Sequence, residues 1–393
     1  MMSKVLLVDT NFSSAPIYNY LVRVGHEVYV IGGNQNDYLA KSINNYIKID
    51  YSDVDKTREL IGVLGINYIV PGCNDRSYQV CAQLNSNGQF HGLDTIETSE
   101  TINNKQKFRE FANKIGLPVP QVVSNENIDE VWPLIVKPVD AFSGRGVTVI
   151  PKRERNLLKS AINCAKEFSH LNSYIVEEYV EGQLFSHTAF ITGQQIVADF
   201  VVEEHGTANP FVVDTSRIDY EFSEEMLTRI RAGIEMMAQS LSLVDGLIHT
   251  QFIKNGDEYW LIEITRRCPG DLYSQLIELS TSYNYVENYV RPFINQEILI
   301  DKYTNKKSWI MRHTISQSTD GFFGSIQFNM PLLLEKMVPI SVVGDYLKAS
   351  PFGRVSILFA KTDTKDKLDR LFNNTLERKL YVIHHQKAGH ENS

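Results

Sequence analysis

Residues 134–150 read LIVKPVDAFSGRGVTVI, in which two apolar runs flank a short polar loop. The first run ends in Lys137-Pro138 and the second follows the loop directly, so the pattern predicts a β-hairpin. Because glycine has no Cβ, such a loop lets backbone N–H groups approach phosphate oxygens, and Lys137 would add a positive charge. A purely structural hairpin is the competing interpretation. The stretch is not a P-loop, because it lacks GxxxxGK[ST] before a helix.

A second polar stretch ends the apolar strand pattern in SYIVEEYVEG, residues 173–182. Glu177 and Glu178 lie where this strand turns into a linker. Backbone groups there could meet the edge of an adenine, and a carboxylate could meet an amino group or a ribose hydroxyl. Solvated acidic side chains at a strand end explain the same letters equally well.

A third stretch, residues 246–271, reads GLIHTQFIKNGDEYWLIEITRRCPGD. Its Asn-Gly-Asp turn predicts a hairpin of two strands. Because side chains alternate along a strand, Glu263, Thr265 and Arg267 share one face, and Gln251 lies opposite them on the partner strand. An oxygen-rich corner beside an arginine suits Mg²⁺ and phosphate. A structural Glu-Arg ion pair is the alternative.

The first hundred residues alternate strand and helix patterns. KVLLVD, EVYVIGG and INYIVPG read as strands, and residues 15–24 and 54–64 read as helices. This order predicts a Rossmann-like parallel sheet with crossover helices. The first turn, DTNFSSAP, has no GxGxxG, so a dinucleotide site is not expected. Asp9, Asn11 and residues 71–75 fall at the carboxyl edge of this sheet, which is expected to wall one side of the ligand cleft. For Asn74-Asp75 we favour the alternative of turn residues.

Beyond a polar stretch near residue 100, strands become more frequent and helices are expected near residues 154–168 and 223–241. The pattern is α+β and mostly antiparallel. The fold class is therefore α/β plus α+β, with three parts at residues 1–100, 101–300 and 301–393. The last part is expected to carry short strands, a Lys-rich tail and a loose end of about ten residues.

Composition excludes several functional classes. The 39 Lys and Arg residues against 47 Asp and Glu give a net charge of −8 without a basic run, so nucleic acid is not the expected partner. No stretch is long and apolar enough for a signal peptide or a membrane span. The four cysteines form no CxxC pair, which fits reduced thiols and a cytoplasmic location.

The three stretches, in this order and at these separations, resemble the ATP-grasp superfamily, in particular its carboxylate-amine ligase branch with an N-terminal Rossmann-like domain. The resemblance covers about residues 1–300. It implies a two-subdomain ATP-grasp fold after residue 100, with a lid subdomain at about residues 118–184. It also implies ATP and Mg²⁺ as cofactors, with Mn²⁺ as the alternative ion, and it makes a homodimer possible.

The resemblance also assigns residues. The phosphate-binding lysines would be Lys105 and Lys137. The flexible lid would comprise Ser143, Gly144, Arg145, Gly146 and Val147. The adenine hinge would comprise Glu177, Glu178, Tyr179, Val180 and Glu181, with Val180 binding through its backbone. The metal ligands would be Gln251, Glu263 and Thr265. The catalytic residues would be Arg267, which stabilises the acyl phosphate, and Lys137. Arg217 and the loop at residues 266–271 are expected near the carboxylate substrate.

Three positions depart from the family pattern. Leu184 stands where a ribose-binding Glu is common, which leaves Glu181 or Gln183 for the ribose. Gln251 replaces a metal-binding acid, and Thr265 replaces the usual Asn. A neutral carbonyl holds Mg²⁺ more weakly than a carboxylate, so Glu263 and the phosphates would carry more of the metal binding.

The implied function is an ATP-dependent ligase that activates a small-molecule carboxylate as an acyl phosphate and joins it to a small-molecule amine. A bicarbonate-using carboxylase of the same fold is one alternative. A non-catalytic nucleotide sensor with a decayed metal site is another, and Gln251 with Thr265 would fit it. Bicarbonate dependence would identify the carboxylase, and nucleotide binding without ADP release would identify the sensor.

Overall fold

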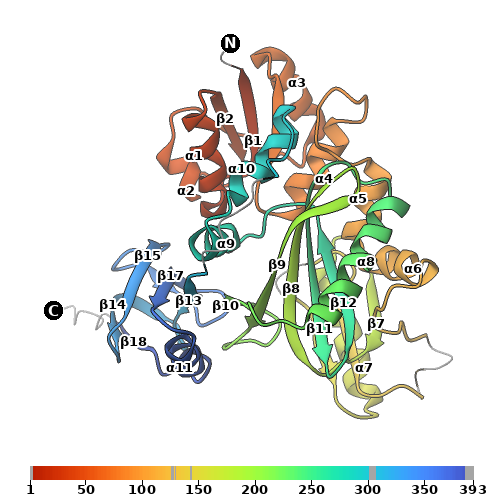
Figure 1. Cartoon of the computed structure of the whole chain (residues 1–393), viewed down its shortest axis with the longest axis vertical. Helices are drawn as coiled ribbons and strands as arrows, with labels where there is room; N and C mark the ends of the chain where they lie inside the picture. The colour runs from red at the N-terminus through yellow and green to blue at the C-terminus, as the bar shows by residue number, and fades with distance from the viewer. Residues whose placement is uncertain (1–2, 125–127, 129, 142–143, 301–306, 386–393) are drawn as a thin grey trace, which may run out of the picture. The chain divides into compact units, whose positions relative to one another are not determined.

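The computed structural model describes residues 3–124, 128, 130–141, 144–300 and 307–385, and Figure 1 traces the chain. Two compact units are present. One comprises Met1–Val201, Glu221–Gly270 and Asn284–Asp301, and the other comprises Val202–Tyr220, Asp271–Tyr283 and Lys302–Ser393. The chain thus passes between the units several times, and the second unit is assembled from three separate segments.

The first unit begins with a four-stranded parallel sheet in the order β3-β2-β1-β4, drawn in red and orange in Figure 1. Its strands are β1 (Lys4–Val8), β2 (Glu27–Gly32), β3 (Tyr46–Lys48) and β4 (Tyr68–Pro71). Residues 5–8 of β1 are 0% exposed, as expected for a central parallel strand that is covered on both faces. The predicted Rossmann-like sheet is confirmed.

Helices connect and extend this sheet: α1 (Ala15–Arg23), α2 (Tyr38–Ser42), α3 (Val54–Leu64), α4 (Asp75–Leu84) and α5 (Ile96–Asn103), with the short η1 (Phe12–Ser14). The side chain of Asn74 caps α4 by accepting a hydrogen bond from the Ser77 N–H at 2.9 Å. The favoured turn at Asn74-Asp75 is therefore wrong, because these residues begin a helix. The cap places Asp75 at the carboxyl edge of β4.

A smaller antiparallel sheet, in the order β6-β5-β7, follows α6 (Lys105–Lys114). Its strands are β5 (Leu134–Pro138), β6 (Thr148–Ile150) and β7 (Tyr174–Glu178), and α7 (Arg155–Phe168) packs on it. Leu134, Val136 and Ile150 are fully buried in their shared core. The hairpin predicted from residues 134–150 is confirmed by the pairing of β5 with β6.

Long antiparallel strands form the rest of the first unit, in the order β12-β11-β8-β9. They are β8 (Gln183–Thr192), β9 (Gln195–His205, of which residues 202–205 belong to the second unit), β11 (Gly246–Asn255) and β12 (Glu258–Thr265). Helix α8 (Glu224–Ser240) packs on this layer through Ile230, Ile234 and Met237. The remaining elements are α10 (Tyr285–Val290) and η2 (Arg291–Ile294). The antiparallel prediction is confirmed.

An ion pair ties α8 to this layer and gives a testable pH dependence. Arg231 Nε lies 2.7 Å from Asp199 Oδ2, and His187 Nε2 lies 2.8 Å from the same oxygen. Burial opposes ionisation of Asp199, yet the hydrogen bonds from His187 and Arg231 lower its pKa from 3.8 to about 2. A depressed folded-state pKa contributes stability above the unfolded pKa, and this contribution is lost as the pH falls through the folded pKa.

We therefore expect Asp199→Asn to lower the free energy of unfolding by about 2 kcal/mol at pH 7. The deficit should shrink by about half at pH 3, because the stabilisation that the ionised Asp199 carboxylate gives the wild type decreases as the pH falls toward its folded-state pKa. Urea titrations of wild type and variant between pH 7 and pH 3 measure this. A deficit that stays constant over that range would contradict the assignment.

The second unit combines a strand and a helix from two internal segments with the strands and the helix of the C-terminal region. Its elements are β10 (Thr215–Ile218), α9 (Tyr273–Thr281), β13 (Trp309–Ser316), β14 (Gly321–Phe328), β15 (Leu333–Pro339), β16 (Tyr346–Leu347), β17 (Arg354–Thr362), α11 (Lys365–Leu376) and β18 (Tyr381–His385). Antiparallel pairing joins β10, β13, β17 and β15, and a second small sheet has the order β16-β14-β18. Leu368, Leu371 and Phe372 of α11 fill its core.

The C-terminal region differs from the expectation of short strands and a Lys-rich tail. Strands β13 and β17 have 8 and 9 residues, and the first 12 residues of the Lys-rich stretch form α11. The expected loose end lies mostly in residues 386–393, outside the described residues. Within the part of the chain that the structure describes, none of the helices has the length and apolar character to cross a membrane.

Candidate active site

Glu263 and Gln251 face each other across the β11-β12 pair, as the alternation of side chains predicted. A register shift follows Gln251, and such a bulge turns neighbouring side chains at a strand end. Lys105, the first residue of α6, brings its Nζ to 3.6 Å from Glu263 Oε1. The same Nζ donates to the carbonyl of Ala141 at 2.8 Å, so it also touches the start of the glycine loop.

Lys137 lies deep in the first unit rather than on an open surface. Its Nζ is 2.7 Å from Glu177 Oε2, and Arg109 Nε is 2.5 Å from Glu177 Oε1. Arg109 also donates through Nη2 to the carbonyl of Ile262, the residue before Glu263, at 2.8 Å. This buried network links β5 and β7 to the strand that carries Glu263. Sequence reasoning missed Arg109, because nothing in its local pattern separates it from a solvated helix arginine.

The charges of this network set its pKa values. Burial alone would raise the pKa of Glu177, but Lys137 and Arg109 lower it. Burial lowers the pKa of Lys137, and the charge of Arg109 adds to this effect against the attraction of Glu177. Because two cations share one carboxylate, the network carries a net positive charge that can attract an anion beside Lys137.

The predicted lid loop is only partly described. Ser143 lies outside the described residues. Gly144 and Gly146 have φ values of +66° and +68°, a region that favours glycine. A Cβ on Gly146 would lie 2.9 Å from Pro138 Cγ and 3.0 Å from Phe168 Cβ, so this glycine has a packing reason as well. Arg145 is exposed, and the Val147 N–H bonds to the Gly144 carbonyl at 3.3 Å.

The predicted hinge continues from β7. The Glu178 and Tyr179 N–H groups donate to the carbonyls of Gln121 and Pro133, both at 2.9 Å. The Glu178 carboxylate accepts from the Gln121 N–H at 2.9 Å, whereas Glu181 is exposed. The Val180 N–H has no hydrogen-bond partner among the residues that the structure describes. Glu177 is thus committed to the buried network, and the Val180 backbone remains the candidate contact for adenine.

Arg267 forms two hydrogen bonds with Asp75, the first residue of α4. Its Nε lies 2.9 Å from Asp75 Oδ1 and its Nη2 lies 3.0 Å from Asp75 Oδ2. The Thr265 hydroxyl donates to Asp75 Oδ1 at 2.9 Å. On the opposite face of the strand, Arg266 Nε donates to buried Asp94 at 2.7 Å. The alternation therefore separates Arg267, which contacts Asp75, from Arg266, which contacts Asp94.

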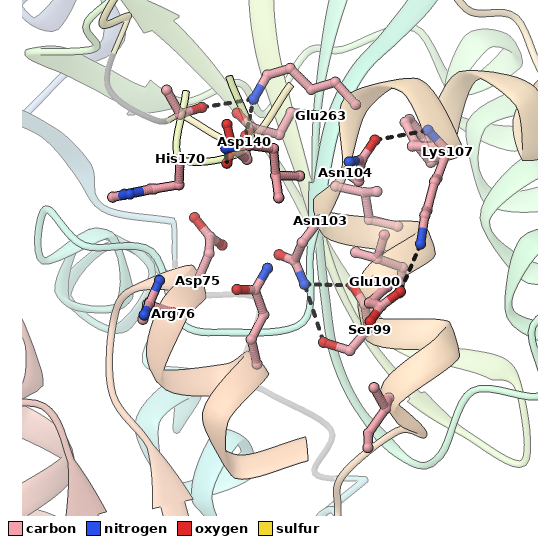
Figure 2. A pocket seen from close by; sticks show the side chains of 18 of the residues that line it. Asp75, Arg76, Ser99, Glu100, Asn103, Asn104, Lys107, Asp140, His170 and Glu263 are labelled. Carbon is pink, nitrogen blue, oxygen red and sulfur yellow. Dashed lines mark hydrogen bonds and ion pairs between the residues drawn. The ribbon is translucent and has the colours of Figure 1, made fainter. Parts of the chain in front are cut away.

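A cavity of about 430 Å³ runs along these residues. Figure 2 shows its wall, with Asp75 from α4, Asn103 from α5, and Glu263 and Asp140 among the labelled side chains. Lys105 and the backbone at residue 141 line it as well. The cavity therefore joins the Lys105–Glu263 pair to the start of α4. Arg76 and His170 also line it, and sequence reasoning did not single them out.

Arg217, expected near a carboxylate substrate, belongs to the second unit. Its Nε lies 2.8 Å from Glu203 Oε2, its Nη1 pairs with Asp369, and the guanidinium stacks 4.2 Å from the centre of the Phe372 ring. These contacts account for the guanidinium without a ligand. Its predicted role stays a prediction.

The oxygen atoms at the β11-β12 corner fit a magnesium ion. Glu263 offers a carboxylate that is 41% exposed, and its cross-strand partner Gln251 carries an amide whose oxygen is a possible ligand type for this ion. Mg²⁺ commonly uses only one or two protein carboxylates and completes its shell with water and phosphate oxygens. Among the described residues no three His, Cys, Asp or Glu side chains form a metal cluster.

Comparison with known proteins identifies the part of the chain that carries these residues. Residues 130–275 match the family model of the ATP-grasp domain. The chain carries an ATP-grasp domain. The predicted ATP-grasp domain and fold class are confirmed, and the proteins that the chain resembles are ATP-grasp ligases. The matched residues include the hairpin, the hinge and the β11-β12 corner.

Curated relatives are distant. Formate-dependent phosphoribosylglycinamide formyltransferase of Prochlorococcus marinus subsp. pastoris is 22% identical over 311 residues, which are 75% of this chain and 77% of that protein. Phosphoribosylamine–glycine ligase of Thermococcus gammatolerans is 23% identical over 293 residues, 67% of this chain and 66% of that protein. At this identity the relatives differ among themselves in substrate, so none of them supplies one for this ATP-grasp domain.

A solved structure extends the likeness to the whole chain. The L-amino acid ligase from Bacillus licheniformis superimposes with a TM-score of 0.80 and 14% identity, over 98% of this chain and 99% of that one. This likeness concerns the fold alone. It indicates that the elements on both sides of the ATP-grasp domain also belong to an arrangement known from that protein.

Proposed function

We propose that this protein is an ATP-dependent carboxylate-amine ligase. The carboxylate substrate attacks the γ-phosphate of ATP, which gives an acyl phosphate and ADP. The amine then attacks the acyl carbon, inorganic phosphate leaves, and an amide or peptide bond results. The observation that carries the proposal is the meeting of Lys105, Glu263 and Asp75 along one cavity, with Arg267 bound to Asp75.

Different residues would stabilise the negative charge in the two steps of the reaction. Phosphoryl transfer depends mainly on positioning and on positive charge around the phosphates, which Lys105, Lys137 and the backbone of residues 144–147 would supply. Glu263 and Gln251 would hold Mg²⁺, which neutralises phosphate charge when bound. Arg267 would stabilise the negative oxygen that develops when the amine attacks. The loop would keep water from the acyl phosphate.

Support for an amine acceptor comes from the relatives. One relative is named as a ligase of phosphoribosylamine and glycine, and the similar structure is named as a ligase of L-amino acids. Both names describe a carboxylate joined to an amine. The identity of both substrates, a cytoplasmic location and a homodimer stay predictions.

The proposal is tested by ADP release from ATP and Mg²⁺ across a panel of amino acids, dipeptides, other carboxylates and bicarbonate, each with and without an amine. We expect one carboxylate and one amine together to stimulate release and to yield an amide that mass spectrometry detects. Stimulation by bicarbonate alone would favour a carboxylase. Nucleotide binding without ADP release from any mixture would favour a sensor.

A further inference from the structure

We infer that Asp75, at the start of α4, is a positioning residue that fixes the guanidinium of Arg267 so that only its end-on edge faces the reacting groups. The inference rests on the proposed ligase function. It gives the N-terminal sheet a direct part in the second half of the reaction, because Asp75 follows β4 and precedes the first helical turn that borders the cavity.

The geometry of the pair defines which N–H groups are used. Asp75 accepts from Nε and Nη2, which form the side-on edge of the guanidinium, at 2.9 and 3.0 Å. Arg267 Nη1 contacts the carbonyl of Cys268 at 3.4 Å. The remaining N–H groups on Nη1 and Nη2 point along the end-on edge. A planar fork held on one edge has little freedom to rotate, so the other edge is pre-oriented.

Thr265 completes the arrangement and explains its own departure from the family pattern. Its hydroxyl donates to Asp75 Oδ1 at 2.9 Å and accepts from the Arg267 N–H at 3.3 Å. The hydroxyl therefore bridges the arginine's backbone and the carboxylate that holds its side chain. Because this hydroxyl is hydrogen-bonded to Asp75, we assign metal binding to Glu263 and Gln251 and not to Thr265.

Electrostatics favour the charged form of both partners. Burial opposes ionisation of Asp75, yet Arg267, Thr265 and Lys105 lower its pKa. Burial likewise opposes the charge on Arg267, but Asp75 and then Glu263 raise its pKa above the ordinary value. The two groups are thus a fixed dipole at neutral pH. A preorganised dipole stabilises developing charge without having to reorient during the reaction.

Asp75→Asn tests this role, since the amide keeps the shape but places an N–H₂ group against one arm of the guanidinium. With the substrates found in the panel, we expect kcat for amide formation to fall ~10- to 100-fold, as for a misplaced catalytic group. KM for the carboxylate and the Kd of ATP should change less than about threefold, because Asp75 acts after these have bound. Asp55→Asn is the matched control, because Asp55 is an exposed aspartate in the first turn of α3.

A double-mutant cycle separates positioning from a merely structural effect. If Asp75 acts through Arg267, Asp75→Asn should have no further effect on kcat in an Arg267→Gln background. Equal losses in both backgrounds, or wild-type kcat in Asp75→Asn, would overturn the inference while leaving the ligase proposal intact. Absence of carboxylate-dependent ADP release in the wild type would overturn the ligase proposal and this inference with it.

Thr265→Val keeps the cycle informative if Asp75→Asn does not fold, because it removes only the bridging hydroxyl at nearly constant volume. We expect a kcat loss of roughly 3- to 10-fold, in the range of a single lost orienting hydrogen bond, that disappears in the Arg267→Gln background. Thr265→Ser should restore kcat, since it returns the hydroxyl. An unchanged kcat in Thr265→Val, or no restoration by serine, would contradict the bridge.

Discussion

Replacement of Glu177 by alanine is expected to lower the free energy of unfolding by ~3–5 kcal/mol, because it leaves two buried cations without their shared carboxylate. Arg109 and Lys137 pair only with this side chain among the described acidic residues, at 2.5 and 2.7 Å. The side chains of Glu177 and Arg109 are 0% exposed, and that of Lys137 is 9% exposed. Water therefore cannot replace the lost carboxylate.

Urea denaturation followed by circular dichroism measures this effect, with two control variants. Glu178→Ala removes the neighbouring carboxylate, which accepts one backbone hydrogen bond near the surface, and should cost about 1 kcal/mol. Lys137→Met leaves the Glu177–Arg109 pair in place and should be milder than Glu177→Ala, although it removes a phosphate-binding charge. Equal losses in Glu177→Ala and Glu178→Ala would contradict the central role of the buried carboxylate.

Most of the fold could be predicted from local sequence patterns. Helix α3 has the predicted limits, since Asp53 caps its start and Gly65, at φ +63°, ends it. The hairpins of residues 134–150 and 246–271 also have the predicted strands, because period-two alternation and turn residues act over a few positions. Helix α11 was missed although Leu368, Leu371, Phe372 and Thr375 are buried at helical spacing. There the abundance of lysine obscured a periodicity that was present.

The site could be predicted less well, because its contacts join distant parts of the sequence. Asp75 and Arg267 are 192 residues apart, and Arg109 and Glu177 are 68 residues apart. Local patterns in a single sequence extend over a few residues, so they do not indicate that such distant positions are in contact. Asn74-Asp75 after a Pro-Gly pair was interpreted as a turn on local grounds, and only the tertiary arrangement gives Asp75 a partner. The alternation on β12, by contrast, correctly placed Arg267 and Arg266 on opposite faces.

Two acidic residues that the sequence singled out, Glu177 and Glu263, differ in their surroundings. Glu177 is enclosed and neutralised by two cations, so its removal should appear in stability. The side chain of Glu263 is 41% exposed, and the ion pair that it forms with Lys105 spans 3.6 Å. An exposed pair at that distance contributes little to folding. A function that needs an available carboxylate is therefore assigned to Glu263 and not to Glu177.

Glu263→Ala is expected to reduce ADP release on the order of 10²- to 10³-fold while leaving the unfolding midpoint nearly unchanged. Loss of the carboxylate that orients Mg²⁺ on the phosphates removes several kcal/mol of charge stabilisation in the transition state, and each 1.36 kcal/mol is tenfold in rate. The effect should persist at saturating ATP, since the lysines and the hinge still bind the nucleotide. Part of it should be recovered at high Mg²⁺, because Gln251 remains across the strand.

ADP release as a function of Mg²⁺ concentration measures this loss, with Glu258→Ala as the matched control on the same strand. Glu258 stands at the far end of β12, where it is exposed and lies 3.6 Å from Arg229, so its removal should leave both turnover and Mg²⁺ dependence unchanged. If Glu263→Ala retained more than about half of the wild-type rate, the metal would have to be held elsewhere, and the Glu263–Gln251 assignment would be wrong. If both variants lost activity alike, the effect would belong to the strand and not to the carboxylate.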